Sequence, residues 1–377
     1  MGQGGDGVGR LNLKTLKLLL LRAGFNGLYQ LFYWLGGPKQ HRVTFATMRS
    51  PELTDNLKFL HAKFVEDSDM DLKVFCYHYD RTLKSKFGFL LASVQALRLL
   101  ARSEMFIIDD YFFPLYAINK HPNNQVVQLW HAIGSLKHFG LSLPTADDSV
   151  IKPHTNYDWV FINSEVDKPA YVAAFDIQPD HVLATGEPMM DALMAQRPEP
   201  HAGAKRLLYS PTYRPDANGE AQVLHYIHEL ITASEQLKQP WEIYVSLHPY
   251  LSLPEWQLPT NVHIFQDATR VKQLMPTIDV FVTDYSSLSL NFSYFERPIL
   301  LFTPDYEQYM AKNGFYVDYY HYLGAPHFDE AGALISFIAH DLDQLDLSYV
   351  HELKQKTFPH QDGHNAQRVF QFLMKQL

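Results

Sequence analysis

The sequence predicts an α/β protein built from two doubly wound domains with a cleft between them. Apolar runs of strand length alternate with helix-like stretches over most of the 377 residues, as in parallel sheets covered by helices. A polar segment with two prolines, 196–205, interrupts this alternation, which then resumes. We interpret that segment as a linker, and the length of the chain suits two domains better than one.

Each expected strand is a short apolar run. Before the linker these runs lie at 42–46, 72–77, 105–108, 126–130 and 159–162, with a helix expected at 90–101. After the linker they lie at 206–209, 242–247, 262–265, 279–282 and 298–302. Ligands of such sheets bind beyond the carboxyl ends of the strands. The residues directly after each run are therefore the candidates for chemistry.

Composition restricts the class of function. Hydrophobic residues make up 46% and charged residues 19% of the chain, which is typical of a globular protein. The formal net charge of −9 argues against nucleic acid as a partner, because its phosphate backbone requires a basic surface. The single cysteine, Cys76, excludes an internal disulfide or a Cys-based metal cluster. No cluster of other metal ligands stands out, and the sequence leaves a requirement for Mg²⁺ as a cofactor open.

The first 37 residues are interpreted as a separate segment. Residues 11–35 are rich in leucine and aromatic side chains, but Arg22 and the small residues after it interrupt the apolar run. The run is therefore too short for a membrane-spanning helix, and no signal-peptide cleavage site follows it. One face of the expected helix is leucine-rich, and the other carries Arg10, Lys14 and Lys17. This pattern fits a basic amphipathic helix at a membrane surface and equally a helix packed on its own domain.

Two histidines follow strand-like runs, one in each predicted domain. His131 comes directly after 126–130, and His248 comes directly after 242–247. One histidine can act as a general base near neutral pH, and the other can stabilise charge on a phosphate. A histidine hydrogen-bonded in the core is the commoner situation, and the chain contains 19 of them.

Two further turns after strands suit phosphate binding. Arg214 lies in the turn after 206–209, and a guanidinium binds phosphate well, although an exposed surface arginine is commoner. The segment 283–287 (TDYSS) joins an expected strand to an expected helix. Hydroxyls and free backbone N–H groups at such a point bind phosphate, and a plain helix cap uses the same residue types. The sequence has no Walker A motif, G-x-S-x-G elbow, H-E-x-x-H motif or G-x-G-x-x-G after a strand.

Together these segments resemble the CDP-glycerol glycerophosphotransferase family, the teichoic acid primases and polymerases. The resemblance runs from about Met105 to the C-terminus, and the order and spacing of its motifs carry it. The motifs are Gln128-Leu129-Trp130-His131 with Lys137 after it, Thr185-Gly186-Glu187-Pro188 with Asp191, Ser210-Pro211-Thr212-Tyr213-Arg214, Thr283-Asp284-Tyr285-Ser286-Ser287, Arg297-Pro298-Ile299 and Gly314-Phe315-Tyr316. Ala132 and Met189 depart from the glycine and arginine that are common in the family, and both flank the expected acceptor side.

The resemblance implies a GT-B architecture of two Rossmann-like domains with the active site between them. The implied parts are a membrane-associating segment at 1–37, an acceptor domain at 38–195 and a CDP-polyol donor domain at 206–377. An acceptor hydroxyl would attack the β-phosphorus of CDP-glycerol, or of another CDP-polyol, and release CMP. By this resemblance His131 is the candidate base and His248 assists at the phosphate. The implied substrate-binding residues are Thr212, Arg214, Asp284, Ser286, Ser287, Gly186 and Glu187.

The implied acceptor is a lipid-linked saccharide or polyol phosphate in teichoic acid or related cell-wall polymer synthesis. The protein would then be peripheral, at the cytoplasmic face of the bacterial cell membrane. One alternative is a GT-B glycosyltransferase that uses a nucleotide sugar, because the same side chains suit any diphosphate donor. Another is a membrane-associated scaffold that retains a nucleotide-binding fold. Competition by CDP against UDP, and binding of CDP-glycerol, distinguish these hypotheses.

Overall fold

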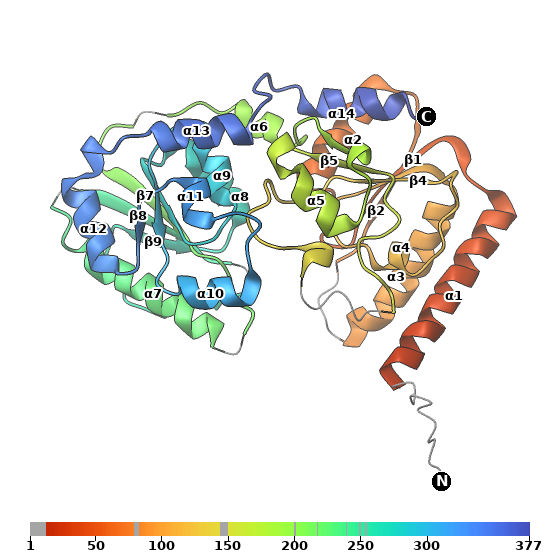
Figure 1. Ribbon diagram of the computed structural model, residues 1–377, viewed down its shortest axis with the longest axis horizontal. Helices are drawn as coiled ribbons and strands as arrows, with labels where there is room; N and C mark the ends of the chain where they lie inside the picture. Colours follow the sequence, from red (N-terminus) through yellow and green to blue (C-terminus); the bar gives the residue numbers. More distant parts are fainter. Residues whose placement is uncertain are drawn as a thin grey trace, which may run out of the picture.

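Two parallel six-stranded sheets form the two lobes of the protein (Figure 1). The computed structural model describes residues 13–78, 83–143, 150–199, 201–216, 218–238, 240–248, 250–252 and 255–377. Every paired strand in both sheets is parallel to its neighbour. The predicted α/β fold class is therefore confirmed.

The first sheet has the strand order β2-β1-β3-β4-β5-β6. Its strands are β1 (Lys39–Thr47), β2 (Asp71–Cys76), β3 (Ser103–Ile108), β4 (Gln125–Gln128), β5 (Trp159–Ile162) and β6 (Val182–Ala184). Helices α1 (Leu13–Gly36) and α3 (Leu83–Ala101) cover one face, and α2 (Asp55–Asp67) and α14 (Asn365–Met374) cover the other. Two short helices, α4 (Phe113–Tyr116) and α5 (Lys168–Phe175), complete this lobe.

Strand β3 shows why these runs are apolar without alternation. Phe106 and Ile108 pack in the core under α1 and α3, whereas Met105 and Ile107 pack in the core under α2 and α14. Successive side chains of a strand point to opposite faces, and here both faces are buried. A continuous apolar run is the expected signature of such a strand.

The second sheet has the strand order β12-β11-β10-β7-β8-β9. Its strands are β7 (Lys205–Ser210), β8 (Trp241–Ser246), β9 (Val262–Phe265), β10 (Val280–Thr283), β11 (Ile299–Phe302) and β12 (His327–Phe328). Helices α7 (Gly219–Ser234) and α12 (Ala331–His340) cover one face. The other face is covered by α8 (Ala268–Leu274), α9 (Leu288–Phe292), α10 (Tyr306–Asn313), α11 (Tyr319–Leu323) and α13 (Ser348–Thr357).

The chain crosses between the lobes more often than the sequence suggested. After α13 it returns to the first lobe, where Val369, Phe370 and Leu373 of α14 join the core under β1 and β3. In the other direction, α6 (Met190–Met194) packs into the core of the second lobe. The expected donor domain at 206–377 therefore includes a helix that belongs to the first lobe. The apolar face of α14 fits a sheet in either lobe, so its sequence pattern does not show which one it covers.

Helix α1 is packed along part of its length and exposed along the rest. Phe25 and Tyr29 are buried against the first lobe, whereas Leu13, Leu16 and Leu20 are exposed. Among the helices of the described ranges, none is long and apolar enough to cross a membrane. The basic face expected around Arg10 falls partly in residues 1–12, outside the described residues.

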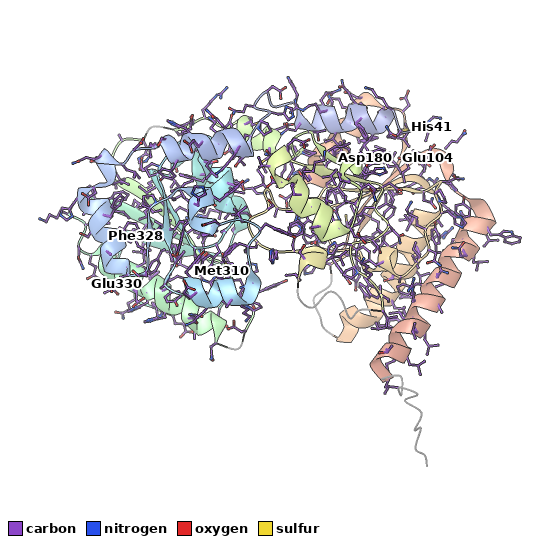
Figure 2. All side chains as sticks on the ribbon, in the orientation of Figure 1. His41, Glu104, Asp180, Met310, Phe328 and Glu330 are labelled. Carbon is purple, nitrogen blue, oxygen red and sulfur yellow. The ribbon has the colours of Figure 1, made fainter. Side chains whose placement is uncertain are left out.

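The two sheets turn their carboxyl edges toward the space between the lobes. His41, in the first part of β1, and Glu104, in the first part of β3, lie at the outer end of the first lobe (Figure 2). Their side of the sheet is the amino edge, and the His41 backbone N–H donates to Glu104 Oε2 at 2.6 Å. The loops after the strands therefore face the second lobe, where ligands of such sheets bind.

Candidate active site

Both predicted histidines line one cavity between the lobes. This cavity has a volume of about 520 Å³ and includes His131 from the loop after β4 and His248 from the loop after β8. Thr212, Ser286 and Ser287 also line it. The structure thus brings together five of the nine residues that the sequence singled out.

The backbone before His131 is held in an uncommon conformation. Trp130 has a φ of +56°, which is rare for a bulky residue and tends to occur at functional sites. The Gln128 side-chain oxygen accepts the Trp130 N–H at 2.9 Å, and the Trp130 carbonyl accepts from Asn56 Nδ2 at 3.1 Å. Gln128, the first residue of the Gln-x-Trp-His motif, therefore stabilises the turn that places His131 in the cavity.

The imidazole of His131 lies beside a carboxylate. Its Nδ1 is 3.5 Å from Oδ1 of Asp110, which follows β3. Burial lowers the pKa of His131, while the negative charge of Asp110 raises it and the nearby Arg49 lowers it. The net direction is downward, so the ring is neutral at neutral pH and can accept a proton.

Four charged residues around His131 were not identified from the sequence. Arg49 contacts Asp55 at 2.8 Å, Asp109 at 3.3 Å and Asp110 at 3.8 Å. Desolvation raises the pKa of Asp109 to about 6 despite its contact with Arg49. The only available sequence signal was that Asp109 and Asp110 directly follow an apolar strand.

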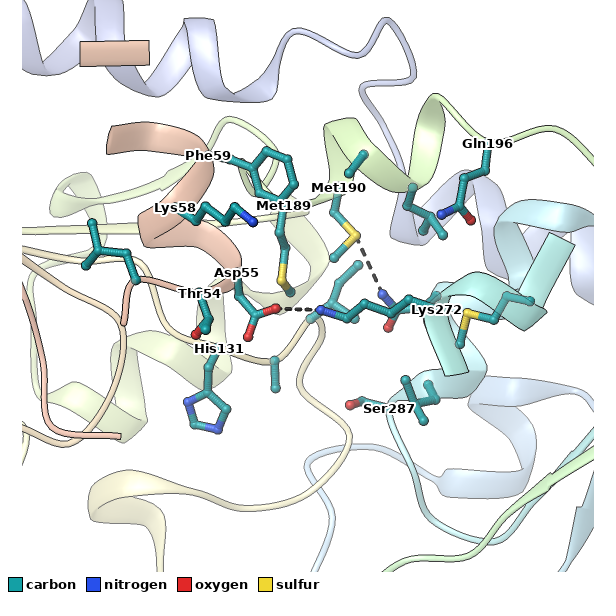
Figure 3. A pocket seen from close by; sticks show the side chains of 18 of the residues that line it. Thr54, Asp55, Lys58, Phe59, His131, Met189, Met190, Gln196, Lys272 and Ser287 are labelled. Atoms are coloured by element: carbon teal, nitrogen blue, oxygen red, sulfur yellow. Dashed lines mark hydrogen bonds and ion pairs between the residues drawn. The ribbon is translucent and has the colours of Figure 1, made fainter. Parts of the chain in front are cut away.

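An ion pair crosses from one lobe to the other beside His131. Lys272 of α8 places Nζ 2.5 Å from Oδ1 of Asp55, at the start of α2. Figure 3 shows this pair with His131 and Ser287 nearby. The pair borders a second cavity of about 530 Å³, which is also lined by Met189.

His248 is oriented by its own loop. The backbone N–H of Tyr250 donates to His248 Nδ1 at 3.2 Å, and the Tyr213 ring stacks on the imidazole at a centroid distance of 5.0 Å. Burial lowers the pKa of His248. Because Nδ1 accepts a hydrogen bond, the proton of the neutral ring is on Nε2. His248 can therefore donate a hydrogen bond from Nε2.

Asp284 organises the loops on the second-lobe side of the cavity. Its carboxylate accepts from the Thr212 N–H at 2.8 Å and from Thr212 Oγ1 at 2.7 Å. It also accepts from the N–H of Tyr285 at 2.5 Å. Ser286 Oγ accepts from the Leu288 N–H at 3.2 Å at the start of α9. Ser287, the residue directly before α9, makes no side-chain capping hydrogen bond, so the plain helix cap considered from the sequence is not formed by this residue.

Arg214 does not lie where a ligand of the diphosphate was expected. Its side chain is buried, with Nη1 2.9 Å from Asp284 and Nε 3.1 Å from Asp305. The guanidinium also lies between the rings of Tyr285 and Tyr309, at 5.1 and 4.7 Å from their centroids. Two carboxylates already neutralise this group inside the second lobe, and it is not among the residues that line the 520 Å³ cavity.

Gly186 and Glu187 also lie away from this cavity. Gly186 has a φ of +80°, and a Cβ at this position would collide with the Asn365 side chain of α14. Glu187 is buried, accepts from Asn56 Nδ2 at 3.1 Å, and has a pKa raised to about 8 by desolvation. Asn365 Nδ2 donates to the Glu187 carbonyl at 3.1 Å. The contacts of Gly186 and Glu187 join α2, α14 and the loop after β6. These two residues therefore hold the lobe together and do not line the cavity.

No metal site is evident in the part of the chain that the structure describes. Among these residues, no three His, Cys, Asp or Glu side chains come together as a group able to hold a metal ion. The polar side chains that line the 520 Å³ cavity are imidazoles, hydroxyls, lysine ammonium groups and the amide of Gln266. This set suits proton transfer and the binding of an anion.

The sequence matches the model of the CDP-glycerol:poly(glycerophosphate) glycerophosphotransferase family over residues 28–375. A teichoic acid ribitol-phosphate primase of Bacillus spizizenii is 26% identical over 96% of this chain and 98% of its own. A teichoic acid glycerol-phosphate primase of Bacillus subtilis is 26% identical over 74% of this chain and 76% of its own. A poly(ribitol-phosphate) polymerase of B. spizizenii is 27% identical, but this chain covers only 56% of it.

Solved structures with the same fold include the wall teichoic acid polymerase TagF. It matches with a TM-score of 0.70 and 16% identity, over 97% of this chain and 98% of that chain. A UDP-GlcNAc 2-epimerase of Methanocaldococcus jannaschii matches with a TM-score of 0.58 and 12% identity, over 89% of this chain and 99% of that chain. At these identities the likeness concerns the fold alone, and it confirms the expected two-lobed GT-B architecture.

Proposed function

The chain belongs to the CDP-glycerol:poly(glycerophosphate) glycerophosphotransferase family, and we propose how its cavity performs that family's reaction. The activity is transfer of glycerol phosphate, or a related polyol phosphate, from a CDP-linked donor in teichoic acid or related cell-wall polymer synthesis. The observation that carries the residue assignments is the meeting of His131 and His248 at one cavity between the lobes.

His131 is the general base of the proposed mechanism. The acceptor hydroxyl gives its proton to the neutral imidazole as its oxygen bonds to the β-phosphorus of the donor. The bond from that phosphorus to the bridging oxygen breaks, and CMP leaves with the bonding electrons. Asp110, 3.5 Å from Nδ1, stabilises the imidazolium that forms. A positioned base of this kind contributes about 10²–10⁴-fold to the rate.

The second lobe holds the donor in this proposal. Nε2–H of His248 donates to a phosphate oxygen, where charge accumulates during transfer. The hydroxyls of Thr212, Ser286 and Ser287 lie on the same cavity wall, and Asp284 keeps their loops in place. Arg214 acts indirectly, because it supports Asp284 from inside the lobe.

The first lobe receives the acceptor and approaches the membrane. A groove of about 550 Å³ runs from Asp110, beside His131, to Leu21 of α1 and Phe89 of α3. The same two helices expose Leu13, Leu16, Leu20, Phe87, Leu90 and Leu91. An exposed apolar surface of this kind suits contact with a bilayer. We therefore place the enzyme peripherally at the cytoplasmic face, where a lipid-linked acceptor is within reach.

CMP release by the purified protein tests the function. CDP-glycerol and CDP-ribitol are offered in parallel, each with and without a lipid-linked disaccharide or polyol-phosphate primer. We expect acceptor-dependent CMP from one donor, which also identifies the polyol. His131→Ala should lower this rate about 10²–10⁴-fold in a folded protein. If a folded protein with a competent acceptor releases CMP from neither donor, the nucleotide-sugar alternative takes precedence.

A further inference from the structure

Lys137 is a lysine of the first lobe whose side chain lines the 520 Å³ cavity. It lies six residues after His131, in a loop clamped against the second lobe. The His138 N–H donates to the Gly314 carbonyl at 3.4 Å, and the Tyr316 N–H donates to the Leu136 carbonyl at 3.0 Å. The backbone on both sides of Lys137 is therefore hydrogen-bonded to the second lobe, and its side chain lines the cavity.

The ammonium group of Lys137 has no counterion among the described residues. Its nearest recorded partner is the Tyr309 ring, whose centroid is 6.0 Å from Nζ. Burial lowers the pKa of Lys137, Asp284 raises it and Arg214 lowers it, and the net direction is downward. The Asp284 carboxylate is already occupied by Arg214 and Thr212.

The cavity around Lys137 is lined by basic side chains and, among the described residues, lacks a carboxylate that could neutralise them. The cavity is lined by two lysines and two histidines, and no Asp or Glu is among its lining residues. The second lysine, Lys272, is paired with Asp55, which leaves Lys137 as the unpaired cation of this wall in the described part of the chain. An unpaired charge held away from water is costly unless a partner neutralises it. The protein as a whole has a net charge of −9, but the described lining of this cavity is cationic and without carboxylates. We therefore expect it to bind an anion.

We propose that Lys137 binds a phosphate group of the CDP-linked donor, and so supplies from the first lobe the positive charge that Arg214 cannot supply from the second. This inference rests on the proposed function for the identity of the anion. The Ser286 and Ser287 hydroxyls line the same cavity, so the diphosphate lies between their loop and the Lys137 loop. Donor binding then makes a contact with each lobe.

Binding measurements with three probes test this role. The probes are CDP-glycerol, CDP and cytidine, which has the same base and ribose but no phosphate. We expect Lys137→Met to weaken binding of CDP-glycerol and CDP about 10- to 100-fold, the range for a lost charge-assisted hydrogen bond, and to leave cytidine binding unchanged. Lys137→Arg should retain most of the affinity, because it keeps the charge.

The melting temperature of the free protein separates this role from a structural one. Removing an unpaired, partly buried cation should leave the melting temperature of Lys137→Met unchanged or higher. Lys312→Met, which removes an exposed lysine paired with Asp216 at 2.7 Å, is the matched control and should bind all probes normally. Equal weakening of CDP and cytidine, or unchanged CDP binding in Lys137→Met, would overturn the proposal.

Inorganic pyrophosphate distinguishes failure of this inference from failure of the proposed function. If the wild-type protein binds pyrophosphate through Lys137 but binds neither CDP-glycerol nor CDP-ribitol, the assignment of the donor is wrong. If it binds a CDP-polyol and Lys137→Met binds that donor equally well, the donor assignment stands and the role of Lys137 is wrong.

Discussion

The pKa of His131 is set by opposing contacts, and this makes the role of Asp110 measurable. Burial lowers that pKa, and Asp110 is the first of the influences that raise it. Asp110→Asn should therefore lower the pKa of His131 further. Because the base acts in its neutral form, the acid limb of the pH profile of kcat/KM should shift to lower pH. The maximal rate should fall as well, since the imidazolium formed during transfer loses its nearest carboxylate.

A pH–rate series on wild-type protein and Asp110→Asn measures both effects. Asp343→Asn is the control, because it removes an exposed carboxylate of the second lobe that pairs with Lys205 at 2.8 Å, far from His131. An acid limb that stays in place in Asp110→Asn would mean that Asp110 does not act on the titrating base.

Arg214 provides a second test at the scale of the residue, directed at stability. Its removal leaves the buried carboxylates of Asp284 and Asp305 without their cation, and breaking a buried pair typically costs about 3–5 kcal/mol. We expect Arg214→Met to lose that amount of unfolding free energy in a denaturant titration. Lys312→Met, at an exposed pair, should lose at most about 1 kcal/mol. If Arg214→Met is stable but no longer binds CDP, Arg214 contacts the donor directly, and its assignment as a supporting residue is wrong.

Sequence reasoning predicted which side chains line the cavity where a strand end alone determines their position. His131, His248, Ser286 and Ser287 follow strands of parallel sheets and line the cavity. Arg214 follows a strand too, but its long side chain turns inward to two carboxylates, one of them 91 residues away in the sequence. The direction of a side chain depends on such distant partners. For the same reason the sequence offered no reason to choose Arg49, Asp55 or Lys272.

At the scale of the element, the structure settles one of the two roles that the sequence of α1 left open. Phe25 and Tyr29 anchor it to the first lobe, while Leu13, Leu16 and Leu20 remain exposed. A single helical pattern could not separate these roles, because leucine occurs on more than one side of the helix. The packed half is thus established, and membrane contact by the exposed half stays a prediction.

Replacing the exposed leucines tests the membrane contact. We expect the triple variant Leu13→Ser, Leu16→Ser and Leu20→Ser to sediment with anionic liposomes at least about tenfold less than wild type, because each leucine loses its apolar burial in the bilayer. Its melting temperature should stay the same, since these side chains are exposed. Phe25→Ala is the contrasting variant and should lose about 3–5 kcal/mol of stability. Unchanged sedimentation of the triple variant would assign α1 to packing alone.

At the scale of the whole molecule, the alternation of strands and helices predicted five of the six strands in each sheet and missed the edge strands β6 and β12. Each apolar run after the linker has a counterpart in β7 to β11, because a strand buried on both faces needs a continuous apolar sequence. The crossings at α6 and α14 could not be predicted in this way. They depend on which apolar surface is nearest after the chain has folded, and Met190 and Val369 fit the cores they enter without a local signal for either.

The return of α14 has a mechanical consequence. The described chain begins at α1 and ends just after α14, and both lie on the first lobe (Figure 1). The second lobe is therefore an insertion between two parts of the first lobe, which the chain leaves after β6 and re-enters at α14. Tension applied between the two ends would load the first lobe at α1 and α14, and the second lobe would bear none of it until α14 had been pulled from its sheet.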